Sequence, residues 1–428
     1  MLNLDKMNSG KLKKIINENK AWSNQSDSLI AVQKTGGGLE KYVKLALGWD
    51  GGRVIYDHVR GYKVQVDAVY PTLAKPEVVI SVTYTDPDLK GHSNENKLHL
   101  KVGELALLKF AHPKIKVVLV LGGSQDAWLG YVLKAFEYFF DEVIYLWNTE
   151  GLERLQTIKT SHETVKLRHE GFWDQLNKEW SKINFYSNNN FIIPNSLFRY
   201  KTLDDFKMQK PKIFHPSLIT NEVARLCMQR SKDYSGAEWE SYLQDRWVNI
   251  EMSRNYFNPM ESLVEILLTE AKLKFEGGVA RDIEVPSFLH QLGLKGTRVS
   301  EDFVLFSKKL NKKVYIQCKA SGGGRDQHGK NIQNRTKEQI TRNILYRSSI
   351  KEGKMHLDEK NFYWISVLDG NWSINSSEPF KYIHMLQIAG YDKIFGVQNL
   401  VLDDGLTPKK KNNPLIDHLL KELDCTLV

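Results

Sequence analysis

The first part of the chain alternates between two hydrophobic periods. Some segments are rich in valine, isoleucine, threonine and tyrosine and lie between prolines or glycines, which is typical of strands. Others carry apolar residues every three to four positions, which favours helices. The pattern predicts strands at 62–70, 76–85, 116–123 and 141–147, and helices at 36–47, 97–111 and 128–140. Strands that alternate with helices predict a mixed α/β sheet covered by helices.

The last part of the chain repeats this order of elements. Asn258 and Pro259 suit the cap and first turn of a helix. The pattern then predicts a helix at 258–275, a hairpin at 301–321, a helix at 334–350, a strand at 361–370, a helix at 380–391 and a strand at 392–402. Both ends therefore follow the order helix, two strands, helix, strand, helix, strand, which we interpret as a degenerate internal duplication.

The middle of the chain is crowded with charges and reads as helical. We predict three ranges: an α/β domain at 1–150, a helical middle region or connector at 151–258, and a second α/β domain at 259–428. The predicted fold class is α/β, with tandem mixed sheets flanked by helices. At 428 residues the chain is too long for one ordinary core, which agrees with several domains.

Composition narrows the function classes. Hydrophobic residues make up 41% of the chain, and no run of eighteen apolar residues or export signal is visible, so we expect a globular cytoplasmic protein without a membrane partner. Three cysteines without zinc spacing predict a reducing compartment and no structural metal. The glycine-rich stretches KTGGGLEK and VLGGSQDAW lack the spacing of a phosphate loop, so no nucleotide cofactor is expected. The formal charge of +9 favours an anionic partner, and nucleic acid is the commonest large one.

The hairpin at 301–321 carries the candidate chemistry. Asp302 begins its first strand, and Gln317 and Lys319 share one face of its second strand while Cys318 points to the other. A carboxylate and an amide oxygen are hard ligands suited to Mg²⁺, and a lysine can position water or stabilise charge in the transition state. Glu265, on the preceding helix with Glu261, is the candidate for a further acid. The alternative is an amphipathic edge strand that presents Gln317 and Lys319 to water.

Asp302 followed by Gln317-Cys318-Lys319 resembles the PD-(D/E)xK nuclease superfamily, in the QxK variant of Mrr-type restriction nucleases. The resemblance covers roughly residues 259–402 and implies a restriction-endonuclease-like sheet. It implies that Asp302, Gln317 and the carbonyl of Cys318 hold the metal ion and that Lys319 is the catalytic lysine. The stretch GGVARD, between the helix and the hairpin, is interpreted as an ordinary turn.

Two polar segments are candidates for contacts with DNA. A glycine-rich turn with cations follows Lys319 and leads into a helix, which suits a phosphate backbone beside a scissile bond. The segment TDPDLKGHSNENKLHLK suits base-edge or phosphate contacts. A solvated loop and a surface turn are the alternatives. The candidate DNA-binding residues are Arg325, Lys330, Arg335, Arg342, Asn94 and Asn96.

The first α/β domain tests the idea of a duplication. Asp67 occupies the acid position, but Ser81 and Thr83 stand where the second domain has its glutamine and lysine. We expect this domain to have lost its chemistry and to bind DNA or a partner. The alternative is that Lys97 or Lys101, on the following helix, supplies the missing ammonium.

These features together predict a Mg²⁺-dependent endonuclease of double-stranded DNA, most simply a type II restriction enzyme. With one site per chain, cutting both strands predicts a homodimer. Two other classes stay open: a non-catalytic DNA-binding protein built on decayed nuclease folds, and a subunit of a larger nuclease complex.

Overall fold

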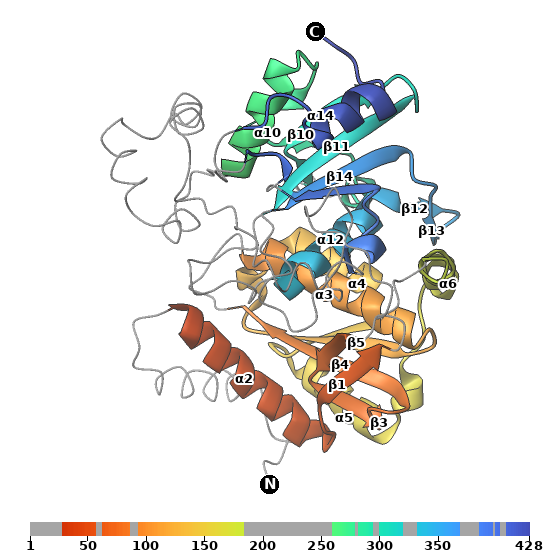
Figure 1. Ribbon diagram of the computed structural model, residues 1–428. Helices are drawn as coiled ribbons and strands as arrows, with labels where there is room; N and C mark the ends of the chain where they lie inside the picture. Colours follow the sequence, from red (N-terminus) through yellow and green to blue (C-terminus); the bar gives the residue numbers. More distant parts are fainter. Residues whose placement is uncertain are drawn as a thin grey trace. The chain divides into compact units, whose positions relative to one another are not determined.

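The structure, a computed structural model, describes ten ranges of the chain (Figure 1): 28–56, 62–85, 93–183, 259–278, 281–293, 299–319, 332–368, 385–396, 399–402 and 408–428. The chain divides into two compact units. The first unit comprises Met1–Lys182, Phe288–Thr297 and Lys337–Leu357, and the second comprises Ile183–Ser287, Arg298–Thr336 and Asp358–Val428. The first unit therefore includes Phe288–Thr297 and Lys337–Leu357, two segments that lie within the predicted range 259–428.

The first unit contains a four-stranded mixed sheet. Its strand order is β3-β4-β5-β6, in which β3 and β4 are antiparallel and the remaining neighbours are parallel. Its strands are β3 (Ala68–Pro71), β4 (Pro76–Tyr84), β5 (Lys116–Gly122) and β6 (Glu142–Tyr145). The central strand β5 is buried along almost its whole length, as its continuous apolar sequence predicts.

Helices pack on this sheet through their apolar faces. They are α2 (Ser28–Leu47), α3 (Ser93–Ala111), α4 (Gly130–Phe139) and α5 (Thr149–Thr160), with short 3₁₀ turns η2 (Gln125–Ala127) and η3 (His162–Thr164). Helix α6 (Glu170–Trp180) packs on α3, where the rings of Trp180 and Phe110 meet. In one core cluster, Leu39 and Val43 of α2 lie against Ile80 and Val120 of the sheet and Leu155 of α5. The burial of these side chains against the strands holds α2 in place over the sheet.

The second unit contains a five-stranded mixed sheet with the order β15-β14-β11-β10-β7. Its strands are β7 (Glu276–Gly277), β10 (Phe303–Ser307), β11 (Lys312–Lys319), β14 (Phe362–Leu368) and β15 (Lys393–Gly396). Helix α10 (Pro259–Glu270) covers one face together with the C-terminal segment α14 (Pro414–Asp417) and η7 (His418–Glu422) (Figure 1). The core on this face includes Leu267, Ile316, Val367 and Leu419.

The two sheets share one topology. In each, an antiparallel hairpin is followed by two parallel neighbours: β3-β4-β5-β6 in the first unit and β10-β11-β14-β15 in the second. The pairings Ala68↔Ile80 and Phe303↔Ile316 start the two hairpins. One step earlier, the same register sets Asp67 opposite Ser81 and Asp302 opposite Gln317. The predicted repeat is therefore present in strand order, strand direction and register.

Three smaller two-stranded sheets escaped prediction. They are formed by β1 (Gly52–Tyr56) with β2 (Tyr62–Val66), β8 (Ile283–Glu284) with β9 (Ser300–Glu301), and β12 (Ser348–Lys351) with β13 (Lys354–Leu357), and the short helix α11 (Phe288–Gln291) was also missed. The single strand predicted at 62–70 was wrong, because the chain changes partner at Asp67, between β2 and β3. The helix predicted at 334–350 is α12 (Ile332–Arg347), and its last three residues instead begin β12.

The predicted helical middle region is described in part. Helices α5 and α6 lie in it, and residues 184–258 lie outside the described residues. None of the described helices combines the length and apolarity that crossing a lipid bilayer requires.

Within the first unit, α3 meets α12 at a glycine. A Cβ atom on Gly103 would lie 2.4 Å from the carbonyl oxygen of Lys337. Nearby, the Thr341 hydroxyl donates to the carbonyl oxygen of His99 at 2.5 Å, and the Lys337 ammonium lies 2.6 Å from the Glu104 carboxylate. The close contact of the two helices therefore depends on the missing side chain at position 103.

We expect Gly103→Ala to lower the free energy of unfolding by roughly 1–3 kcal/mol, the usual cost of forcing extra atoms into a packed contact. Alanine is intrinsically the better helix former, so a loss must come from the clash with Lys337. Gly130→Ala is the matched control, because no atom lies within 4 Å of a Cβ at Gly130. Urea unfolding of both variants measures the difference, and equal stabilities would contradict the close contact.

Candidate metal centre

Asp302 lies at a bend between β9 and β10, at the start of the hairpin that the sequence singled out. Its carboxylate oxygen Oδ2 accepts a hydrogen bond from the backbone N–H of Cys318 at 2.5 Å. The Cys318 side chain packs in the apolar core with Val314 and Ile316. The prediction that Cys318 points away from its neighbours' face is therefore confirmed, and the strand pair fixes the orientation of the acid.

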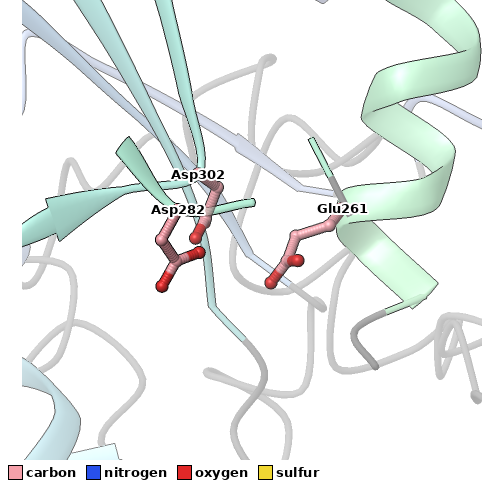
Figure 2. A group of neighbouring side chains, drawn as sticks. All are labelled: Glu261, Asp282 and Asp302. Atoms are coloured by element: carbon pink, nitrogen blue, oxygen red, sulfur yellow. The ribbon is translucent and has the colours of Figure 1, made fainter. Parts of the chain in front are cut away.

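Three carboxylates gather at this end of the sheet (Figure 2). Glu261, Asp282 and Asp302 each offer a carboxylate oxygen, and these oxygens all lie within 4.8 Å of one another. Glu261 and Asp302 are buried, whereas Asp282 is exposed. Three negative charges at this separation repel one another unless a cation or protons neutralise them. We call Glu261, Asp282 and Asp302 the acid trio.

The acid trio is assembled from three separate elements. Glu261 comes from the first turn of α10, Asp302 from the start of the hairpin, and Asp282 from the position directly before β8. Gly277 and Gly278 have φ angles of +97° and +123°, and a Cβ on Gly277 would lie 2.2 Å from the carbonyl oxygen of Asp302, so the missing side chain allows this close approach. The interpretation of GGVARD as an ordinary turn therefore missed an acid of the site. The available signal was an acid, Asp282, four residues after two consecutive glycines.

Helix α10 offers two acids near this end of the sheet, and a metal-binding role of Glu265 stays a prediction. The acid trio contains Glu261, whereas Glu265 lies one turn further along the helix, about 6 Å along its axis. Glu265 is 1% exposed, and its Oε2 would be 2.5 Å from a Cβ on Gly278. The two residues share a helix face, as the sequence indicates, but only Glu261 belongs to the acid trio.

Burial raises the pKa of the Asp302 carboxyl to about 7. The neighbouring Lys319 ammonium lowers the pKa of Asp302, and Asp282 raises it further. The raised pKa shows that the ionised carboxylate is poorly stabilised by the protein alone. A divalent cation between the carboxylates would favour the ionised form.

The side chains of Gln317 and Lys319 occupy the end of β11. Lys319 is partly buried, and its charge acts on Asp302. Gln317 is 1% exposed, and its Oε1 accepts a hydrogen bond from the Tyr391 hydroxyl at 2.7 Å. The ring of Tyr391 in turn packs at a tilt against Trp364, with ring centroids 4.1 Å apart. This burial excludes the alternative in which Gln317 faces water on an amphipathic edge strand. Ligation of a metal by Gln317 and by the Cys318 carbonyl stays a prediction.

Of the predicted DNA-binding cations, Arg342 alone has a described side chain. Arg325 and Lys330 lie outside the described residues, and of Arg335 only the helical backbone is described. Arg342 is partly buried in α12, in the segment that belongs to the first unit. Their contacts with DNA stay predictions.

The two predicted asparagines differ in environment. Asn96 is exposed on α3. Asn94 is fully buried, where its amide donates to the carbonyl oxygen of Ala127 at 3.1 Å and its oxygen accepts from the Thr85 hydroxyl at 3.4 Å. The structure therefore gives Asn94 a role in holding the start of α3, and of the two only Asn96 is placed to meet a ligand.

Comparison of the chain with protein-family models, with curated proteins and with solved structures finds no match. The chemical reading therefore rests on the geometry: carboxylates that can share a cation, an adjacent lysine, and a hydrogen-bonded strand pair that holds them.

Proposed function

We propose that this protein is a Mg²⁺-dependent endonuclease that hydrolyses phosphodiester bonds in double-stranded DNA, as a type II restriction enzyme does. The observation that carries the proposal is the acid trio beside Lys319, at the end of the strand pair β10–β11. Carboxylate oxygens are the ligands that Mg²⁺ prefers, and a neighbouring ammonium is suited to an anionic substrate. The formal charge of +9 agrees with a polyanionic partner.

The acid trio fits a small hard cation in donor type and in charge. Asp302, Glu261 and Asp282 would hold the ion, and the phosphate of the substrate and water would complete its coordination. Bound Mg²⁺ would lower the pKa of a water molecule and neutralise negative charge that develops on the phosphate. The backbone N–H of Cys318 keeps Asp302 oriented toward this position, since it occupies the carboxylate oxygen Oδ2.

Lys319 would act on the reacting groups directly. Its ammonium would donate hydrogen bonds to the attacking water and to a non-bridging phosphate oxygen. The water oxygen forms a new bond to phosphorus while one ester P–O bond breaks. One water proton is released to solvent and the departing ester oxygen takes up a proton, so the products are a phosphomonoester and a free hydroxyl group.

The primary test uses supercoiled plasmid DNA with the full chain. We expect nicked and linear products with Mg²⁺ and none with EDTA. Retardation of the DNA in a gel without cleavage, at any divalent cation concentration, would contradict the proposal and leave a DNA-binding protein. If the DNA is neither cleaved nor retarded, the endonuclease and the DNA-binding protein are both contradicted.

A matched pair of variants tests which acid of α10 serves the metal. We expect Glu261→Gln to weaken Mg²⁺ binding by at least the ~10-fold that even outer partners of a metal contribute. Glu265→Gln, one helical turn away, is expected to change Mg²⁺ affinity less. Isothermal titration with Mg²⁺ measures both, and the opposite ranking would restore Glu265 as the ligand.

A further inference from the structure

The first unit repeats the hydrogen bond that orients Asp302. The Oδ2 atom of Asp67 accepts from the backbone N–H of Val82 at 2.6 Å, as Asp302 accepts from Cys318 at 2.5 Å. Both acids directly precede the first strand of their hairpin, and both donors lie on the second strand. Asp67 is 7% exposed, the same fraction as Asp302. The acid position of the duplicated sheet is therefore retained in the first unit.

A helix supplies the lysine that β4 lacks. Ser81 and Thr83 stand at the positions of Gln317 and Lys319, so the strand offers hydroxyl groups only. The Nζ atom of Lys101, on α3, donates to the Ser81 hydroxyl at 2.8 Å. An ammonium thus reaches the strand position next to the acid from a neighbouring element.

The two lysines that the sequence offered have different environments. Lys97 donates to the carbonyl oxygen of Tyr84 and to the Thr85 hydroxyl, at the end of β4. Lys101 lies one turn further along α3 and forms an ion pair with Glu104 at 3.2 Å. Burial lowers the pKa of Lys101, but the negative charges of Glu104 and then of Asp67 outweigh burial and raise that pKa above its ordinary value. Of Lys97 and Lys101, it is therefore Lys101 that corresponds to Lys319.

A second acid accompanies Asp67. Glu40 follows Leu39 of α2, which packs in the same core cluster as Ala68, the residue after Asp67. Burial raises the pKa of Glu40, and the charge of Asp67 raises it further. Glu40 is partly exposed on the helix that precedes the sheet, as Glu261 is carried by the helix that precedes the other sheet. Mg²⁺ is commonly held by one or two carboxylates together with substrate phosphate and water. Asp67 and Glu40 meet that minimum. The trio in the second unit exceeds it.

We infer that the first unit holds a second hydrolytic centre, in which Asp67 and Glu40 bind a divalent cation and Lys101 takes the role of Lys319. The inference rests on the proposed function, because the substrate is the same phosphodiester bond and the same balance of bonds and protons applies. Two carboxylates bind the cation more weakly than three, so the second centre needs a higher metal concentration. A chain with two centres can cut both strands of a duplex without a second chain.

Strand-resolved cleavage of supercoiled plasmid tests this inference. Wild type is expected to linearise the plasmid, whereas Lys101→Met and Asp67→Asn nick it and form linear DNA at least 100-fold more slowly. Lys97→Met, on the same helix, is the matched control and linearises as wild type does. Circular dichroism and thermal unfolding confirm that each variant is folded.

Two results overturn the inference. One is linearisation by folded Lys101→Met at the wild-type rate, and the other is equal loss of nicking and linearisation in both variants. Equilibrium dialysis with Mn²⁺ gives a test that needs no cleavage: wild type binds at least two ions per chain, and Asp67→Asn binds one fewer. If wild type cuts no DNA, the proposed function fails, while an Asp67-dependent ion still supports the second centre. An unchanged ion count in Asp67→Asn refutes it.

Discussion

Lys319→Met is expected to lower the rate of Mg²⁺-dependent DNA cleavage at the centre of the second unit by about 10²–10³-fold, the usual effect of removing one group that stabilises charge in a transition state. Lys319 interacts with Asp302 and ends the strand that orients it. Methionine keeps the length of the side chain and removes only the ammonium. DNA affinity is expected to change far less than the rate, because many other contacts bind the phosphate backbone.

Lys313→Met is the matched control for this prediction. Lys313 lies on the same strand and the same face but is exposed, six residues away and therefore about 20 Å from Lys319. We expect its cleavage rate to equal that of wild type. Single-turnover cleavage, with DNA binding measured separately, distinguishes an effect on the cleavage rate from an effect on DNA affinity. Equal rates for Lys319→Met and Lys313→Met would remove Lys319 from the chemistry.

Asp302→Asn is expected to abolish cleavage at this centre and, at the same time, to stabilise the protein above neutral pH. Burial raises the pKa of Asp302 from 3.8 to about 7, so between these values the folded chain holds a proton that the unfolded chain has released. The stability of wild type therefore falls as pH rises through this window, by at most ~1.4 kcal/mol per pH unit. Asparagine has no such proton and still offers an oxygen to the N–H of Cys318.

Thermal unfolding between pH 4 and pH 8 checks this prediction. We expect the melting temperature of Asp302→Asn to exceed that of wild type at pH 8 in EDTA, and the difference to shrink toward pH 4. Mg²⁺ should raise the melting temperature of wild type at pH 8 more than that of the variant, because it binds the folded state through the carboxylate. A pH-independent difference would mean that the Asp302 carboxyl titrates normally.

The sequence predicted those helices and strands whose own hydrophobic period was clear. The buried strands β5 and β14 and the helices α3, α4 and α10 lie where the hydrophobic periods predicted them. The errors have one cause: the change of strand partner at Asp67 and the switch from helix α12 to strand β12 depend on pairings with distant residues. A hydrophobic period carries no information on these pairings.

The candidate site also has residues that local patterns predict and residues that only packing between elements brings in. Asp302, Gln317 and Lys319 were predictable because the strand period and the hairpin set their faces and their register. Glu261 and Glu265 lie on the same helix face, so the helical period does not tell which of them joins Asp302. Only the position of α10 on the sheet places Glu261 in the acid trio. Asp282 directly precedes the two-residue strand β8, which is too short for a period, and it lies next to Asp302 because β8 pairs with β9, with Ile283 opposite Glu301.

The sequence by itself determined the α/β class, the repeated order of elements, and an acid, an amide and a lysine on one strand pair. The tertiary structure alone decided which acids meet Asp302 and which lysine of α3 reaches Ser81, the residue opposite Asp67. The physical reason is that a charge–charge contact depends on a separation of a few ångströms between side chains from different elements. Local periodicity sets the face on which a residue lies, and packing between elements sets that separation.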